Sequence, residues 1–174
     1  LMLSRSEDFQ STTPSPSAHI HLKTGATKEG ILTALQARIE VDSGIFGFPL
    51  AGLFVSLIGG YYKIDNTSID CFEVNTNKPQ VGAYRAPAAP QITFALESNI
   101  DEIAHQIGLD PLEFRYQNAV ETGDMMGNNE PWPHLGLKEC LAELRQHPAW
   151  KNRTKQPNEG IGIAIGGWPS FMGP

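Results

Sequence analysis

The sequence predicts an α+β fold, in which a mostly antiparallel or mixed sheet carries helices packed on one of its faces. Strand-type patterns occupy residues 18–44 and 61–79, whereas helix-type patterns dominate residues 91–146. Strands followed by helices, without an internal repeat, are typical of α+β domains. Hydrophobic residues make up 40% of the chain and charged residues 18%, a composition that allows a packed core.

Residues 18–44 predict two strands joined by a turn. His19 and His21 point to one side of the first strand while Ile20 points to the other, which is the alternation of a half-buried strand. The sequence Thr-Lys-Glu-Gly at 27–30 supplies the turn, after which an apolar alternation returns as the second strand.

Residues 44–60 form the most apolar stretch of the chain. They include no charged residue, but they hold five glycines and Pro49. Because a membrane span needs about 20 apolar residues, we expect a buried helix whose beginning is broken by glycines, and no membrane span. Residues 61–79 predict one or two short strands, since Tyr, Ile, Phe and Val lie there between Asn and Asp residues.

Residues 91–107 predict a long helix, because apolar side chains recur at steps of three and four. Gly108 is expected to end this helix. Asp110 is expected to cap a second helix over 111–120, with a proline at its first position and with Glu113 completing a capping box.

The second helix has one apolar face. Three of its side chains should be buried: Leu112, Tyr116 and Ala119. Phe114 should lie near the edge of that face. A third helix is predicted around Leu137–Gln146, followed by a linker or long surface loop over 147–159 and by the beginning of a new strand in 160–174.

Charge and cysteine content limit the classes of partner. A net charge of -6 and a pI near 5.3 argue against nucleic-acid or anionic-membrane partners, because phosphate binding relies on clustered Lys and Arg. Cys71 and Cys140 lie far apart and outside any CxxC spacing. We expect two reduced, half-buried thiols in a cytoplasmic protein.

Two small clusters of ionisable side chains are candidate sites. His19 and His21 share a strand face that could bind a metal, but no Cys, Asp or Glu stands nearby at ligand spacing, which favours exposed strand histidines. Arg5, Glu7 and Asp8 are expected to form a solvated segment with one internal ion pair.

The unusual segment is the loop at 80–90, where Arg85 is the one cation among small residues and prolines. Two interpretations are open at this point. The loop is either a surface turn whose arginine faces water, or a loop built so that a ligand can approach its backbone closely. No Ser-His-Asp order, P-loop or strand-linked GxGxxG motif is present in the chain.

The sequences VGAYRAPAAPQ (81–91) and FALESNIDEIAHQIGLDPLEFRYQNAV (94–120) closely resemble the molybdopterin-binding large subunit of the molybdenum hydroxylases, the xanthine dehydrogenase and aldehyde oxidase family. The matching features are an aromatic-Arg-small loop at 84–86, Glu97, and a Gly-apolar-Asp-Pro pattern with later Arg and Asn over 108–119. The likeness extends over nearly the whole chain and is most specific in these two stretches.

The resemblance implies a molybdenum–molybdopterin cofactor in the parent protein. Tyr84, Arg85 and Ala86 would bind it, since small side chains let backbone N–H groups reach its oxygen atoms and Arg85 adds a permanent positive charge beside an anionic group. Pro87 would line the substrate pocket. The family's general-base glutamate belongs to a downstream Gly-Glu motif, which is expected beyond residue 174.

Departures from the family pattern narrow the expected substrate. Members that oxidise purines place an arginine in the segment matching 44–60, which has no charge here, and they have Phe at the position of Pro87. Carbon monoxide dehydrogenases place Cys at the position of Ala86. The resemblance therefore predicts an oxidoreductase that hydroxylates an aldehyde or an aromatic N-heterocycle with oxygen from water.

The resemblance also implies how the chain is organised. Residues 1–159 would be a fragment of the first half of a molybdopterin-binding domain, and residues 160–174 would begin the following cofactor-binding half. Expected partners are a small-molecule substrate, the rest of the large subunit, and iron–sulfur and, in some members, flavin subunits or domains. The isolated chain is predicted to be inactive. The alternative is a non-catalytic α+β binding module derived from the same family.

Overall fold

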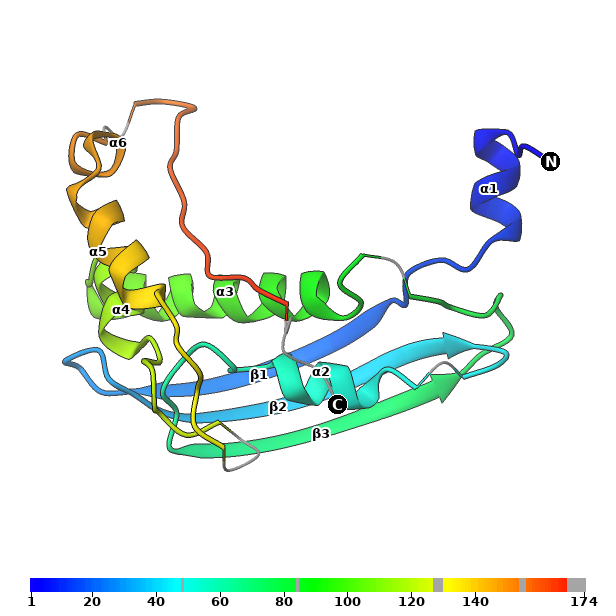
Figure 1. The fold of residues 1–174 in the computed structure, drawn as a ribbon, viewed down its shortest axis with the longest axis horizontal. Coiled ribbons are helices and arrows are strands. Elements are labelled where there is room, and N and C mark those ends of the chain that lie inside the picture. Colours follow the sequence, from blue (N-terminus) through cyan, green and yellow to red (C-terminus); the bar gives the residue numbers. More distant parts are fainter. Residues whose placement is uncertain (48, 84, 127–129, 154–155, 169–174) are drawn as a thin grey trace.

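The computed structural model describes residues 1–47, 49–83, 85–126, 130–153 and 156–168 (Figure 1). Its strands are β1 (Ala18–Ala26), β2 (Leu32–Gly44) and β3 (Asn66–Asn75). Its helices are α1 (Arg5–Ser11), α2 (Ala51–Leu57), α3 (Ala89–Ile107), α4 (Pro111–Asn118), α5 (Leu137–Gln146) and α6 (Pro148–Lys151). The predicted α+β class is confirmed.

The sheet is mixed, with the strand order β1-β2-β3. β1 and β2 form the predicted antiparallel hairpin, whose turn is closed by a hydrogen bond from the N–H of Gly30 to the carbonyl of Thr27 at 3.0 Å. β3 pairs in parallel with β2, and it is one strand of ten residues rather than two short ones. A parallel pair needs a crossover connection, and α2 lies in that connection.

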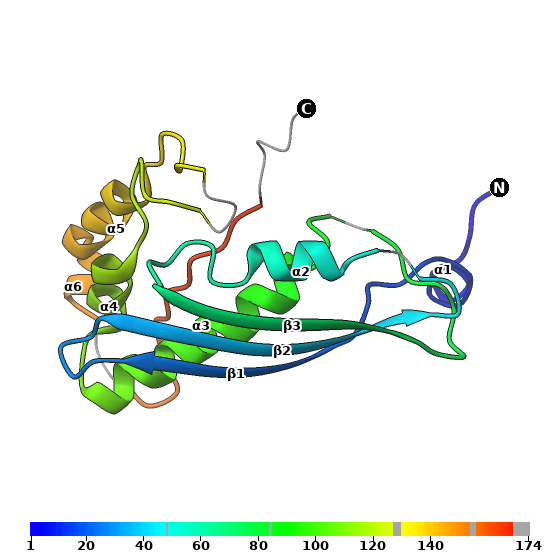
Figure 2. The same cartoon turned by 90° about the horizontal axis from the view of Figure 1, so that it is seen from below.

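Helices cover one face of this sheet, as predicted (Figures 1 and 2). The buried side chains of β2 alternate along the strand: Leu35, Ala37, Ile39 and Val41. Phe54 of α2 and Ile92 of α3 belong to the same buried cluster. On the opposite face the exposed Arg38 stacks on the ring of Phe72 at 4.5 Å.

A second buried cluster joins α3, α4 and α5. Leu112 and Ala119 are buried as predicted, whereas Tyr116 is only half-buried. Phe114 is fully buried, so the prediction that it lies near an edge was wrong. The reason is that α4 contacts both α3 and α5, and a single apolar stripe underestimates burial on a helix covered from two sides. Phe94, which fits the apolar stripe of α3 by spacing, is 79% exposed.

The predicted helix ends are largely confirmed. Gly108 ends α3 in the left-handed conformation, with φ of 74°. Asp110 caps α4 by accepting hydrogen bonds from the N–H groups of Leu112 (2.8 Å) and Glu113 (3.3 Å). The prediction that Glu113 completes a capping box was wrong. Instead of bonding back to the N-cap residue, the Glu113 carboxylate accepts two hydrogen bonds from Arg145 of α5 at 2.6 Å each.

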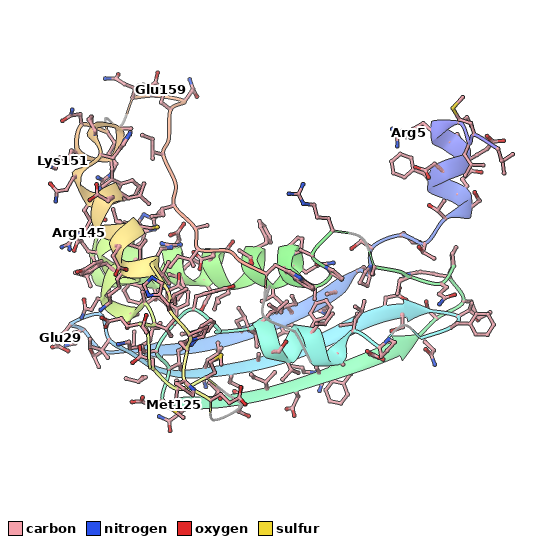
Figure 3. All side chains as sticks on the ribbon, viewed as in Figure 1. Arg5, Glu29, Met125, Arg145, Lys151 and Glu159 are labelled. Atoms are coloured by element: carbon pink, nitrogen blue, oxygen red, sulfur yellow. The ribbon has the colours of Figure 1, made fainter. Side chains whose placement is uncertain are left out.

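The charged segment near the start of the chain is a short helix, α1, which the sequence analysis did not predict. Ser4 and Glu7 cap it reciprocally, and the predicted internal ion pair joins Arg5 to Asp8 at 3.3 Å. The helix buries none of its residues. It stands away from the sheet, with Arg5 at one end of the molecule (Figures 1 and 3).

Two predictions for the C-terminal part of the chain were wrong. Residues 148–151 of the expected linker form α6, which His147 caps through its Nδ1. Within the described residues 160–168 no strand forms, because the buried N–H of Ile165 bonds to a side chain of α3 rather than to a neighbouring strand. The remainder of the expected strand, 169–174, lies outside the described residues.

The cysteines follow the prediction only in part. Both are free; Cys71 is half-buried as expected, but Cys140 is exposed on α5. Burial raises the pKa of the Cys71 thiol. None of the described helices combines the length and the hydropathy that a membrane crossing requires.

Candidate functional site

The loop that connects β3 to α3 carries the predicted site residues. Arg85 is exposed, and no hydrogen bond or ion pair joins it to any residue that the structure describes. Ala86 and Pro87 follow it and are half-buried. Tyr84 lies outside the described residues. The structure therefore leaves the charge of Arg85 available to a group from outside this chain.

The backbone of this loop is strained at two alanines. Ala86 has φ of 55° and Ala88 has φ of 69°, in the left-handed region that residues with a side chain rarely occupy. Such conformations cost on the order of 1–3 kcal/mol each, and they persist where the surroundings hold them. A hydrogen bond from the N–H of Ala89 to the carbonyl of Ala86 (3.2 Å) closes the turn. The small side chains keep this cost low and leave the backbone approachable.

Helix α3 begins directly after this turn. Its N-cap is Ala88, whose side chain cannot accept a hydrogen bond, so no side chain caps the first turn. The N–H groups of Ala89 and Ile92 donate to backbone carbonyls and Pro90 has no N–H, so it is the positive end of the helix dipole that favours an anion there. The helix starts at Ala89, two residues before the predicted start, because Pro90 is well suited to a first turn. Arg85 and this helix end thus contribute positive potential to one region.

A hydrogen-bonded cluster fixes the start of the loop. One oxygen of the Asp42 carboxylate accepts from Thr76 Oγ1 (2.6 Å) and from the N–H of Gly44 (3.1 Å), and the other oxygen pairs with Lys78. Gly44 has φ of 68°, and a Cβ there would overlap the carbonyl oxygen of Pro79. The end of β2 therefore packs tightly on the chain that leads to Arg85. Sequence reasoning missed this cluster.

We expect the stabilising effect of Asp42 to depend on pH. Hydrogen bonds from Lys78, then from Thr76 and the N–H of Gly44, lower the pKa of Asp42 to about 2. A lowered pKa means that the stabilisation is complete above the unfolded-state pKa of about 4 and is lost as the pH falls toward 2. Asp42→Asn should lower the free energy of unfolding by about 1 kcal/mol at pH 7, because Lys78 is largely exposed.

Urea denaturation of both proteins at several pH values checks this result. The difference between the wild type and Asp42→Asn should shrink steadily as the pH falls from 4 through 2. A difference that stayed constant from pH 7 to pH 2 would contradict the proposed role of the carboxylate.

A segment far from the Arg85 loop in sequence forms hydrogen bonds with both ends of that loop. We call residues 13–17 the strap. At one end, the N–H of Gly82 donates to the carbonyl of Pro14 at 3.1 Å. At the other end, Gln91 Nε2 donates to Ser15 Oγ (2.9 Å) and to the carbonyl of Pro16 (3.0 Å). These contacts are long-range, and no local sequence pattern predicts them.

A buried ionic cluster lies deeper in the molecule, between α3 and α4. Arg115 is fully buried; its Nε donates to Glu97 Oε2 at 2.8 Å and its Nη1 donates to Asp101 Oδ1 at 2.7 Å. The hydroxyl of Tyr62 donates to Glu97 Oε1 at 2.6 Å, and the N–H of Ile165 donates to Oε2 at 2.9 Å. Burial, and then the nearby carboxylate, raise the pKa of Tyr62. Both oxygens of Glu97 are occupied, so this carboxylate is a structural group rather than a general base.

Two hollows are formed by described residues, and neither is a pocket of substrate size beside the loop. A cavity of about 10 Å³ lies between α2, α3 and the segment near Ile165, with room for one water molecule at most. A larger hollow of about 520 Å³ lies against α6. It lies near the labelled Lys151 and Glu159, at the other end of α3 from the loop (Figures 1 and 3).

The strand histidines are exposed, as predicted. The rings of His19 and His21 lie 4.4 Å apart, and His19 Nδ1 is 3.8 Å from a carboxylate oxygen of Glu40. Among the residues that the structure describes, no group of three His, Cys, Asp or Glu side chains could hold a metal ion.

Comparisons with known proteins match this chain to part of larger proteins. A family described as the molybdopterin cofactor-binding domain matches residues 1–119. The chain is 33% identical to an aldehyde oxidoreductase from Megalodesulfovibrio gigas, over 88% of this chain and 18% of that protein. It is 29% identical to a putative xanthine dehydrogenase molybdenum-binding subunit from Escherichia coli, over 99% of this chain and 24% of that subunit.

A solved structure agrees with these relatives. The solved structure of aldehyde oxidoreductase from Desulfovibrio gigas superposes with a TM-score of 0.75 at 30% identity, over 86% of this chain and 17% of that one. The chain thus spans about a fifth to a quarter of the length of the curated relatives described above.

Proposed function

The chain belongs to the molybdopterin cofactor-binding domain family, and from this premise we propose that it forms one wall of the molybdenum–pterin site of a molybdenum hydroxylase. The relatives named aldehyde oxidoreductase and xanthine dehydrogenase confirm the resemblance seen in the sequence. Because they are much longer than this chain, the activity, substrate and partners of the parent protein belong to the proposal.

The observation that carries the proposal is the loop around Arg85. It presents an exposed cation without a partner among the described residues, next to two small residues in a strained backbone and an uncapped helix end. These features fit an anionic cofactor with oxygen acceptors at its edge. Arg85 and Ala86, with Tyr84 by resemblance, would hold it, and Pro87 would line the substrate pocket.

The bound molybdenum centre would supply the oxidation, in which water provides the oxygen atom. Arg85 would bind anionic oxygens as a planar, permanently charged donor. Backbone N–H groups of the loop would add fixed donors that need no reorganisation during the reaction. The general base would come from a glutamate outside this chain, since Glu97 is fully occupied within it. We therefore propose that the isolated chain is inactive.

The proposed substrate is an aldehyde or an aromatic N-heterocycle. α2, Ala51–Leu57, lies in the segment where purine-oxidising members place an arginine, and it contains no charged residue. Pro87 replaces the aromatic side chain that those members place in the pocket. Several relatives carry the name xanthine dehydrogenase, but these two positions argue against a purine here.

The partners proposed for this chain are a small-molecule substrate, the rest of the large subunit, and iron–sulfur and, in some members of the family, flavin subunits or domains. Residues 1–159 would belong to the first half of the cofactor-binding region, and residues 160–174 would begin the second half. A cytoplasmic location is part of the same proposal.

The proposal is tested with the full-length protein that contains this chain. Purified protein should contain molybdenum and should oxidise an aldehyde or an N-heterocycle. In ¹⁸O-labelled water the hydroxylated product should carry the label, whereas ¹⁸O₂ should leave it unlabelled. A protein without molybdenum and without turnover would instead support the non-catalytic binding module.

A further inference from the structure

We propose that Gln91 is a positioning residue that works with the strap to set the conformation of the loop carrying Arg85. The consequence for cofactor binding rests on the proposed function, but the positioning itself does not. The loop lies between two attachment points, Gly82 and Gln91, and both attach to residues 13–17.

The direction of the Gln91 amide is fixed by its partners. The carbonyl of Pro16 can only accept a hydrogen bond, so the amide atom 3.0 Å from it must be the donor Nε2. The same nitrogen donates to Ser15 Oγ at 2.9 Å. One side chain in the first turn of α3 therefore holds a segment more than 70 residues earlier in the sequence.

The second attachment point is a close backbone approach. The N–H of Gly82 donates to the carbonyl of Pro14, and a Cβ at Gly82 would overlap the side chain of Thr13. Between the two attachment points lie Ala86 and Ala88, whose left-handed conformations need support from their surroundings. The strap supplies that support from both sides.

Gln91 is not the side chain that stability alone would select. Its Oε1 is buried without a hydrogen-bond partner among the described residues, which is unfavourable. Replacing Gln91 with methionine removes this unsatisfied acceptor together with the two hydrogen bonds to the strap. Removing the unsatisfied acceptor should raise the free energy of unfolding, and losing the two hydrogen bonds should lower it. Only the loss of the hydrogen bonds should change the conformation of the loop.

Hydrogen exchange measured by mass spectrometry on the full-length protein tests the inference. In Gln91→Met, the amides of residues 82–89 should exchange about tenfold faster, which corresponds to about 1.4 kcal/mol. The melting temperature should change little. Gln106→Met is the matched control, because Gln106 is exposed on the same helix. In this variant the amides of residues 82–89 should exchange at the wild-type rate.

A second pair of variants tests the other attachment point. Gly82→Ala should also speed exchange over 82–89, because its Cβ would displace Thr13, and Thr13→Gly in the same protein should restore slow exchange. Unchanged exchange in Gln91→Met would overturn the role of Gln91, and unchanged exchange in Gly82→Ala as well would overturn the role of the strap.

Molybdenum content, measured in the same preparations, separates the two proposals. If the exchange increases as expected but the wild type holds no molybdenum, the positioning role stands and the proposed function fails. If the wild type holds molybdenum, Gln91→Met should retain less of it than Gln106→Met.

Discussion

Replacing Arg115 with methionine should lower the free energy of unfolding by about 3–5 kcal/mol, the usual loss when one partner of a buried ion pair is removed. Arg115 is 0% exposed and bonds to Glu97 and Asp101. Methionine fills much of the same volume but leaves the Glu97 carboxylate buried without its cation. Urea denaturation gives the change in the free energy of unfolding, and the melting temperature should fall with it.

The matched control is Arg145→Met. Arg145 also donates two short hydrogen bonds to one carboxylate, that of Glu113, but both side chains are more than one-third exposed. Removing a pair in contact with solvent should cost at most about 1 kcal/mol. Adding Glu97→Gln to Arg115→Met should recover part of the loss, because the uncompensated charge disappears. The explanation fails if Arg115→Met is no more destabilising than Arg145→Met.

Replacing Arg85 with alanine should leave the melting temperature unchanged and lower the turnover of the full-length protein by about 100- to 1,000-fold, the range for loss of one well-placed donor to a charged group. Stability should be unaffected because Arg85 is exposed and bonds to no described residue. Molybdenum content should fall as well, because the cofactor loses a permanent countercharge. Metal analysis and steady-state kinetics measure the two effects separately.

Two further variants show whether charge or geometry matters at this position. Arg85→Lys keeps the charge but loses the planar fork, so it should fall between the wild type and Arg85→Ala. Lys28→Ala makes the same change of charge in the exposed hairpin turn, and it should have no effect. Wild-type molybdenum content and turnover in Arg85→Ala would show that Arg85 does not bind the cofactor.

The candidate site is proposed from the sequence, because a loop of small residues and prolines with one cation is a local feature. The helix that follows the loop is confirmed, but the exposure of Arg85 fits both a surface turn and a loop that faces a ligand, so the role of Arg85 stays a prediction. The left-handed alanines could not be predicted, since alanine has no preference for that conformation and adopts it only when its surroundings enforce it.

The side chains that form hydrogen bonds around the Arg85 loop could not be predicted from the sequence either. Asp42 looks like any polar residue of a strand, and Gln91 looks like any polar residue of a first helical turn. Their partners lie more than 30 and more than 70 residues away. Spacing rules describe neighbours within one helix or strand, and they carry no information on such distant pairs.

The sequence by itself determined the local elements: the hairpin, the capped helix α4, and the loop that identifies the family. Each depends on residues close together in the chain, through alternation, capping and backbone freedom. The tertiary structure decided the parallel pairing of β3, the complete burial of Arg115 beside Glu97, and the attachment of the Arg85 loop to the strap. These depend on which distant surfaces meet when the core forms, and no local pattern specifies them.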